Sequence, residues 1–161
     1  MQGKWVKAVI LLLGMTAVIF SSSCKRQATD TLSVYDIESE ISQCMTNYSE
    51  MEDCSEEYLS EIFQINTDDT VELVSKRSLD THIDQFGILK QKDEESACEM
   101  AKKINGSIEN LKREWDGRYF SEENAKISAA RAESFGKYVV FAVLDAKETD
   151  TVMKKLEEIV Y

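Results

Sequence analysis

Apolar and polar residues alternate with two different periods along the chain, and these periods predict where helices and strands lie. Over residues 33–51 the apolar residues recur every three or four positions, which is typical of one buried face of an α-helix. A shorter stretch with the same spacing follows over residues 58–65. The two apolar stripes consist of Val34, Ile37, Ile41, Met45, Tyr48 and Met51, and of Tyr58, Leu59, Ile62, Phe63 and Ile65.

The second half of the chain carries the strand-like patterns. We predict strands over residues 70–77, 86–91, 130–134 and 137–144, the last apolar on both faces and therefore central in its sheet. Asp93 is placed to cap a long helix that runs to Trp115, and a short helix follows over residues 121–129. Asp145 and Glu148 have the spacing of a capping box at the start of a last helix, whose apolar stripe ends at Val160.

The order of these elements predicts an α+β fold. We expect two leading helices and then a β-β-α-β-β-α sandwich, with a mostly antiparallel four-stranded sheet and helices packed on one face. The opposite face of the sheet also needs cover, and the amphipathic first helix is a candidate for that position.

Two parts of the chain align when the sequence is shifted by 52 residues. Phe86 then falls on Tyr138, Asp93 on Asp145, and Met100 on Val152, so strand, acidic cap and helix stripe keep register. A structural repeat explains this alignment, and so does the periodicity that any strand followed by a helix shows. The sequence leaves both explanations open.

The N-terminus reads as an export signal. Lys4 and Lys7 precede an uncharged apolar run over residues 8–20, and three serines separate that run from Cys24. At 1.5 Å per residue the run covers about 20 Å, less than the roughly 30 Å hydrocarbon core of a bilayer. We therefore predict a signal peptide over residues 1–23 in preference to a membrane-spanning helix.

The small residues before Cys24 resemble the lipobox of bacterial lipoproteins, although Ser21 stands where that motif usually has leucine. The resemblance implies a diacylglycerol on the Cys24 sulfur and cleavage just before it. Residues 24–32 would then be the lipidated cysteine and a tether, and residues 33–161 a single domain. An ordinary cleaved signal followed by an unrelated cysteine is the alternative.

Charge restricts the partners of this domain. Residues 25–161 keep 17 of the 19 Lys and Arg residues, because Lys4 and Lys7 lie in the leader, and all 30 Asp and Glu residues, a net charge of −13. Such a surface repels the phosphates of nucleic acids and anionic lipids. We therefore expect no nucleic-acid partner, whereas cationic partners remain compatible with the charge.

The cysteines after Cys24 are odd in number, so at least one of them cannot pair within the chain. Cys44 and Cys54 are ten residues apart, near the end of one predicted helix and before the next. A disulfide between them and two unpaired, partly buried thiols both fit this position. Cys98 lies beside the apolar stripe of the long helix.

Motifs for catalysis or metal binding are not found in the sequence. His82 is the only histidine and lies in a polar loop, so a histidine-centred metal site or a Ser-His-Asp triad would depend on it alone. Acidic pairs are too numerous to indicate acid-base catalysis. We therefore name no catalytic residue, no metal and no cofactor. Trp115, Tyr119 and Phe120 cluster after the long helix, either as a partner or ligand surface or as packing over the end of the sheet.

A resemblance to a known family covers residues 35–161. Tyr119, Ser121-Glu122-Glu123 and Gly136-Lys137-Tyr138-Val139 resemble motifs of an uncharacterised family of Gram-positive bacterial lipoproteins with a domain of unknown function. Ser121 stands where that family usually has proline, and Lys137 where it has asparagine. The resemblance implies a fold and a location and adds no reaction.

The sequence thus predicts a membrane-anchored extracytoplasmic lipoprotein without enzymatic activity. It would act as a binding or interaction module for an extracytoplasmic protein or small ligand, through a sheet edge or the aromatic cluster. The competing hypotheses are a cell-envelope hydrolase that uses carboxylates alone, which needs two carboxylates in one pocket, and a purely structural envelope component.

Overall fold

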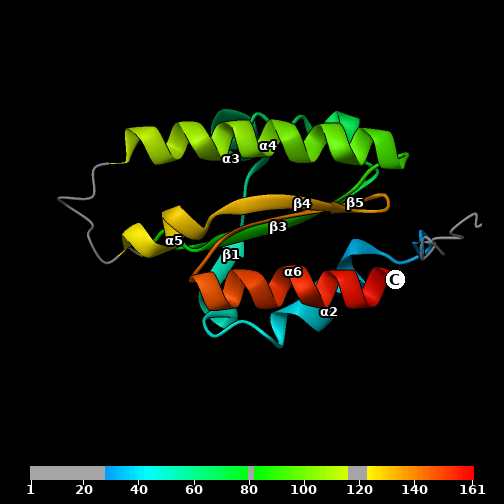
Figure 1. Cartoon of the computed structure of the whole chain (residues 1–161), viewed down its shortest axis with the longest axis horizontal. Coiled ribbons are helices and arrows are strands. Elements are labelled where there is room, and N and C mark those ends of the chain that lie inside the picture. Colours follow the sequence, from blue (N-terminus) through cyan, green and yellow to red (C-terminus); the bar gives the residue numbers. More distant parts are fainter. Residues whose placement is uncertain (1–27, 80–81, 116–122) are drawn as a thin grey trace, which may run out of the picture.

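A computed structural model describes residues 28–79, 82–115 and 123–161, and within them the chain forms one open antiparallel sheet between two layers of helices (Figure 1). The strand order is β1-β2-β3-β5-β4. The strands are β1 (Met51–Asp53), β2 (Glu72–Ser78), β3 (Gln85–Lys90), β4 (Arg131–Phe135) and β5 (Tyr138–Val143). The helices are α2 (Val34–Ser42), α3 (Glu56–Phe63), α4 (Glu94–Glu114), α5 (Asn124–Ala129) and α6 (Ala146–Val160), with 3-10 turns η1 (Tyr48–Glu50) and η2 (Thr67–Asp69). The α+β prediction is confirmed.

The described part of the sheet has five strands where four were expected, because the first predicted helix ends early. That helix, α2, stops at Ser42, and the chain continues through η1 into the short edge strand β1. Met45 is buried, and Tyr48 and Met51 pack against the same core as α2. The apolar spacing over residues 33–51 therefore reported burial correctly, but the later residues reach the core from a loop, a turn and a strand.

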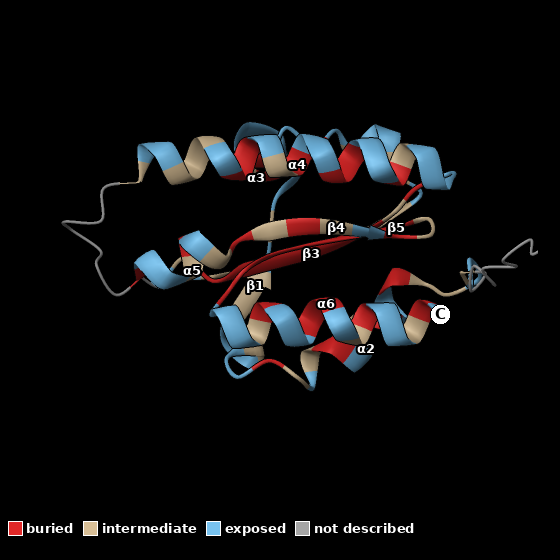
Figure 2. Ribbon diagram, in the orientation of Figure 1, coloured by how far each residue is buried: buried red, intermediate tan, exposed pale blue. Residues whose placement is uncertain are grey.

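Each face of the sheet has its own core (Figure 2). Phe86 and Ile88 of β3 point toward α2 and α6, whereas Leu89 points toward α3 and α4. The expectation that the helices share one face is therefore wrong, since the last helix lies opposite α4 (Figure 1). The first helix does cover the face opposite α4, as expected, and it shares that face with α6.

The alignment at 52 residues is not a structural repeat of the whole unit. β3 and β5 are antiparallel neighbours with Ile88 opposite Val140, so a local twofold axis perpendicular to the sheet relates them. Rotation about such an axis does not exchange the two faces of the sheet. A repeat of the whole unit would therefore place α4 and α6 on the same face. Because these helices cover opposite faces, only the strands obey the symmetry.

The predicted central strand β5 lies between β3 and β4, and every residue from Tyr138 to Val143 is fully buried. It begins at a two-residue turn, Gly136-Lys137, in which Gly136 has φ of 56°. A positive φ at the first turn residue is the conformation that glycine supplies in tight hairpins. A Cβ atom at Gly136 would also lie 2.4 Å from the Cβ atom of Ala28, so this turn holds the first described residue against it.

The outer edge of β4 is hydrogen-bonded to the side chain of Asn105. In the hairpin the N–H and C=O groups of Ala132 point away from β5. Asn105 of α4 meets both groups: its Nδ2 donates to Ala132 O at 2.8 Å, and its Oδ1 accepts from Ala132 N at 2.9 Å. The asparagine amide thus takes the place of a neighbouring strand at this position.

Two helix starts differ in how they are capped. Asp93 caps α4 as predicted, since its side chain accepts from the amide of Ser96 at 2.7 Å. Asp145 occupies the cap position of α6 without a side-chain cap hydrogen bond, so the predicted capping box is wrong. Glu148 instead accepts from the amide of Thr46, which joins α6 to the loop after α2.

The predicted signal peptide and Cys24 lie outside the described residues. Among the helices of residues 28–79, 82–115 and 123–161, none has the length and hydropathy to cross a membrane.

Candidate functional site: a cleft beside Trp115

A cleft of about 260 Å³ opens at the end of the sheet where β2 leaves and β3 enters. Helix α3, the end of α4 and α5 close its sides. We call it the Trp115 cleft. Its walls combine apolar side chains with a small number of polar ones, which is the usual composition of a ligand site. The lining residues are Tyr58, Ile62, Arg77, Ser78, Leu79, His82, Ile83, Asp84, Gln85, Leu111, Trp115 and Ile127.

Arg77 is the cation on one wall of the Trp115 cleft. Its guanidinium lies over the ring of Tyr58 at 4.8 Å, and Nη2 donates to Glu52 Oε1 of β1 at 3.1 Å. The Tyr58 hydroxyl in turn donates to Gln85 Oε1 at 2.8 Å, which fixes the ring. Nε of Arg77 is buried and has no hydrogen-bond partner among the described residues, although 41% of the side chain is exposed. Burial raises the pKa of the Tyr58 hydroxyl, so the ring stays neutral.

A buried ion-pair network includes two residues that line the cleft, His82 and Asp84, and continues behind them to Glu123 and Lys126. Lys126 of α5 donates to Asp84 Oδ2 at 2.7 Å and to Glu123 Oε2 at 2.9 Å. Glu123 Oε1 lies 2.9 Å from Nδ1 of His82, and its Oε2 accepts from the amide of Ile83 at 3.4 Å. The loop before β3 is therefore held by three polar contacts, two to the Glu123 carboxylate and one from Asp84 to Lys126 of α5.

Burial and hydrogen bonding shift the pKa values of Glu123 and Lys126 in opposite directions. Burial alone raises the pKa of the Glu123 carboxyl, but the hydrogen bonds from His82, Lys126 and Ile83 outweigh it, and the net pKa is lowered. Burial likewise disfavours the charged Lys126, yet its hydrogen bonds to Asp84 and Glu123 leave its pKa raised. The hydrogen bond to Glu123, and then its charge, raise the pKa of the exposed His82.

His82, Asp84 and Glu123 could supply three ligand atoms to a metal ion, since these atoms lie within 4.8 Å of one another. The ammonium group of Lys126, however, contacts both carboxylates and neutralises part of their charge. A divalent cation would have to displace it. The charged groups of this cluster are therefore already paired with one another as an ion-pair network.

The same contacts bear on acid-base chemistry. A carboxylate hydrolase needs two carboxylates that face one pocket. Asp84 lines the Trp115 cleft, whereas Glu123 lies beside Asp84 in the network but not among the residues that line the cleft. A general acid must also carry a proton near neutral pH, which requires a raised pKa. The lowered pKa of Glu123 keeps it ionised, which does not suit the role of general acid.

The sequence identified part of this site. Trp115 lies in the cleft, where its Nε1 donates to Asn124 Oδ1 at 2.8 Å. Tyr119 and Phe120, which were predicted to share that surface, lie outside the described residues, as does Cys24. His82 is a loop residue as expected, but its link to Glu123 was missed. Cys44, Cys54 and Cys98 are free thiols, so no disulfide joins Cys44 to Cys54.

Tyr58, Arg77 and the ion-pair network were missed as site residues. Tyr58 and Arg77 had been assigned only to a helix stripe and a strand. The available signal was topological: a loop between two hairpin strands and the end of the helix that follows them lie at the same end of a sheet. His82 and Trp115 stand at these two places.

A protein-family model described as a domain of unknown function (DUF4358) matches residues 43–144. All residues that line the Trp115 cleft fall within this range, whereas α2 and α6 fall outside it. No curated protein and no solved structure matches the chain. The predicted resemblance to a family with a domain of unknown function is thus confirmed for residues 43–144.

Proposed function

We propose a binding function for this chain, which belongs to the DUF4358 family of domains of unknown function. The protein would be an extracytoplasmic lipoprotein, anchored to the cell membrane through an acylated Cys24, whose domain captures a partner in the Trp115 cleft. The leader, the cysteine after three small residues and the resemblance to Gram-positive lipoproteins support the anchor. Two acyl chains suffice for stable attachment, whereas one is marginal.

The cleft itself carries the proposal that the domain binds a partner. Its apolar walls lie next to Arg77, whose planar guanidinium lies over the ring of Tyr58 and whose side chain is 41% exposed. Arginine in such a position suits a carboxylate, because its donors form a fixed fork. His82 also lines the cleft, and its hydrogen bond to Glu123 raises its pKa.

The size of the cleft indicates what kind of ligand it takes. About 260 Å³ is slightly below the ~300–1,000 Å³ of sites that enclose a drug-sized molecule. It suits one large side chain of a peptide. We therefore propose an extracytoplasmic protein that inserts an apolar side chain next to a carboxylate.

Site-specific photocrosslinking in intact cells tests the cleft. The crosslinker replaces Leu79, an apolar residue at the cleft rim that is 63% exposed. The matched control is Val71, which is 58% exposed and lies immediately before β2, away from the cleft. The proposal predicts a protein adduct at position 79 that is absent at position 71 and lost in an Arg77→Ala background. Equal adducts at both positions, or adducts that persist in that background, contradict it.

The Cys24→Ser variant tests the anchor independently. Lipidation predicts that the native protein partitions into membranes with a diacylglycerol mass on Cys24, and that the exported variant is released from the membrane. A variant that stays membrane-bound after export contradicts lipidation as the tether.

The second candidate is the carboxylate-based cell-envelope hydrolase, which the paired Asp84 and Glu123 keep open. The variant Glu123→Gln separates the two functions, because it removes a carboxylate and leaves Arg77 and Trp115 in place. A hydrolase loses turnover of purified cell-wall material in this variant. A binding module shows no such turnover in either form and retains its adduct at position 79.

A further inference from the structure

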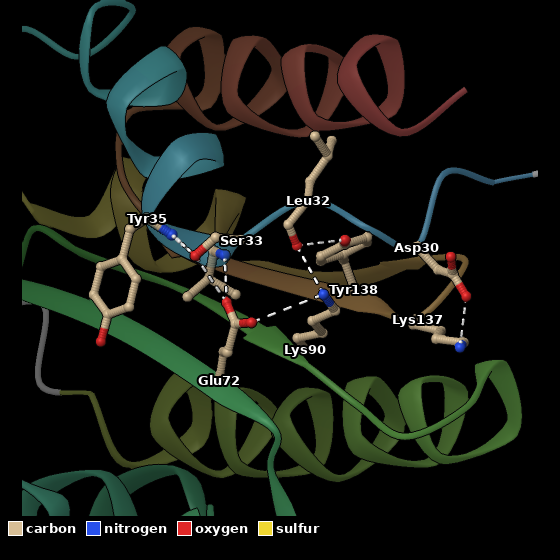
Figure 3. Close-up of polar contacts among 9 residues, drawn as sticks. Asp30, Leu32, Ser33, Tyr35, Glu72, Lys90, Lys137 and Tyr138 are labelled. Atoms are coloured by element: carbon tan, nitrogen blue, oxygen red, sulfur yellow. Dashed lines mark hydrogen bonds and ion pairs between the residues drawn. The ribbon is translucent and has the colours of Figure 1, made fainter.

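The segment that leads from the N-terminus into the domain is fixed to the domain by many contacts (Figure 3). The predicted tether, residues 24–32, is described from Ala28 onward. Thr29 N donates to Val160 O of α6 at 2.8 Å, and Asp30 forms an ion pair with Lys137 of the β4–β5 turn at 2.7 Å. These contacts tie the segment to the end of the domain that carries the Gly136-Lys137 turn.

The next residues are held more deeply. The carbonyl of Leu32 accepts from Lys90 Nζ and from the hydroxyl of the buried Tyr138, both at 2.8 Å. Glu72 of β2 accepts from Val34 N at 2.8 Å and from the hydroxyl of Ser33 at 2.9 Å. Hydrogen bonds to an ionised group are about twice as strong as neutral ones. Residues 28–34 thus form a docked strap, a name that we keep for this segment.

The short distance from the strap to the proposed anchor restricts how the domain can lie. Cys24 and Ala28 are four residues apart, and four residues span at most about 14 Å. Ala28 itself packs against the Gly136-Lys137 turn. A lipid on Cys24 therefore brings this turn, and the neighbouring C-terminus of α6, close to the headgroups.

The C-terminal end of α4 borders the Trp115 cleft and lies at the end of the domain opposite the β4–β5 turn (Figure 1). Helix α4 begins beside the turn, since Gln91 N donates to Lys137 O at 2.8 Å two residues before its cap. It then runs for 21 residues to Trp115, which corresponds to about 30 Å.

We infer that the end of the domain formed by the Gly136-Lys137 turn, Ala28 and Tyr161 is the surface that faces the bilayer, and that the docked strap holds the Trp115 cleft away from the membrane. The inference rests on the proposed anchor at Cys24. It places the partner's contacting segment well above the headgroups, which fits a soluble or wall-associated protein.

Trp115 provides the experiment, because it is the only tryptophan of residues 25–161. The native lipoprotein is purified from membranes and reconstituted into phosphatidylcholine vesicles with plain or brominated acyl chains, which quench tryptophan emission at short range. We expect no loss of Trp115 emission in brominated vesicles. The double variant W115F/Y161W moves the probe to the end of α6, where 42% of Tyr161 is exposed, and its emission should be quenched.

Three further variants in the W115F/Y161W background test the strap. Ten Gly-Ser residues inserted between positions 27 and 28 leave the strap docked but lengthen the tether, and they should abolish quenching. Glu72→Gln with Lys137→Ala loosens the strap and should weaken quenching. Lys154→Ala on the exposed side of α6 is the control and should leave quenching unchanged.

Vesicle flotation distinguishes failure of the anchor from failure of the orientation. Protein that does not float with vesicles refutes the lipid anchor and, with it, the orientation. Protein that floats but shows equal quenching at the two probe positions, or quenching that survives the inserted linker, refutes the orientation alone.

Discussion

Replacing Lys126 with methionine tests whether the ion-pair network holds the cleft together. Methionine has a similar length and removes only the positive charge, so Asp84 and Glu123 remain buried without their shared partner. Both side chains are almost fully buried, at 8% and 3% exposed, and their ligand atoms lie within 4.8 Å. At an effective dielectric constant of about 20, two unit charges at that separation repel by roughly 3 kcal/mol. Removal of one partner from a buried pair typically costs about 3–5 kcal/mol, which is the loss of unfolding free energy that we expect at pH 7.

The dependence on pH has a definite sign. In the native protein the pKa of Glu123 lies below its ordinary value of 4.5, so its ionised form stabilises the fold above that pH and the contribution is lost as the pH falls through the folded pKa. In Lys126→Met only the hydrogen bonds from His82 and Ile83 still offset the burial of Glu123, so the variant gains stability relative to the native protein as Glu123 takes up a proton. The difference between the two proteins should therefore shrink between pH 7 and about pH 4.

Urea unfolding followed by far-ultraviolet circular dichroism measures both effects. The control is Lys154→Met, which removes an ammonium that is 76% exposed and should change stability by less than about 0.5 kcal/mol. A loss below about 1 kcal/mol at pH 7, or a loss that is the same at pH 4, would refute the reasoning, because it would mean that the carboxylates do not depend on Lys126.

Three further substitutions test other parts of the structure. Gly106→Ala should raise the free energy of unfolding by about 0.5–1 kcal/mol in urea titrations, because alanine favours a helix and its Cβ atom meets nothing within 4 Å; a loss of stability contradicts this. Gly87→Ala should lower it by about 1–3 kcal/mol, because the new Cβ atom would lie 2.3 Å from the Phe141 ring in the filled core; an unchanged melting temperature contradicts this. The pKa of His82, measured by NMR, should fall in Glu123→Gln, and an unchanged titration would show that the contact in the structure does not form in solution. Because its folded pKa is raised, His82 contributes stability below its ordinary pKa of 6.5, and this is lost as the pH rises through the folded value.

The elements with long, regular patterns were predictable from the sequence. Helix α4 begins after Asp93, and the fully apolar β5 lies inside the sheet, because capping chemistry and two-sided burial leave local signals. The stripe that ends at Met51 shows where such signals fail. Its spacing records contact with the core, and a loop followed by a short strand satisfies the same spacing as a helix.

The side of the sheet on which a helix packs has no comparable local signal. The stripes of α4 and α6 align at 52 residues, yet Met100 and Val152 belong to different cores. That choice depends on the path of the connections and on what else covers each face. Here α2 and α6 together cover one face of the sheet. The apolar pattern of a single helix does not show which face that helix will cover.

The candidate site was harder to predict for the same reason. Trp115 was noticed because aromatic residues cluster near it in sequence. Lys126, Asp84 and Glu123 come from two separate segments and meet only in the folded chain. In an acidic sequence each of them resembles a solvated surface charge, and only burial distinguishes the three that form the network.

The contact between Asn105 and Ala132 protects the edge strand β4 against pairing with a second copy of the protein. An edge strand with unpaired backbone groups can pair with a strand of another chain. Proteins that are anchored densely on a membrane, as we propose for this one, meet their own copies often. Because the groups of Ala132 that another copy would need are already engaged, two neighbours cannot join their sheets there without first breaking a contact inside each. The protein can therefore be abundant on a surface without linking into continuous sheets through β4.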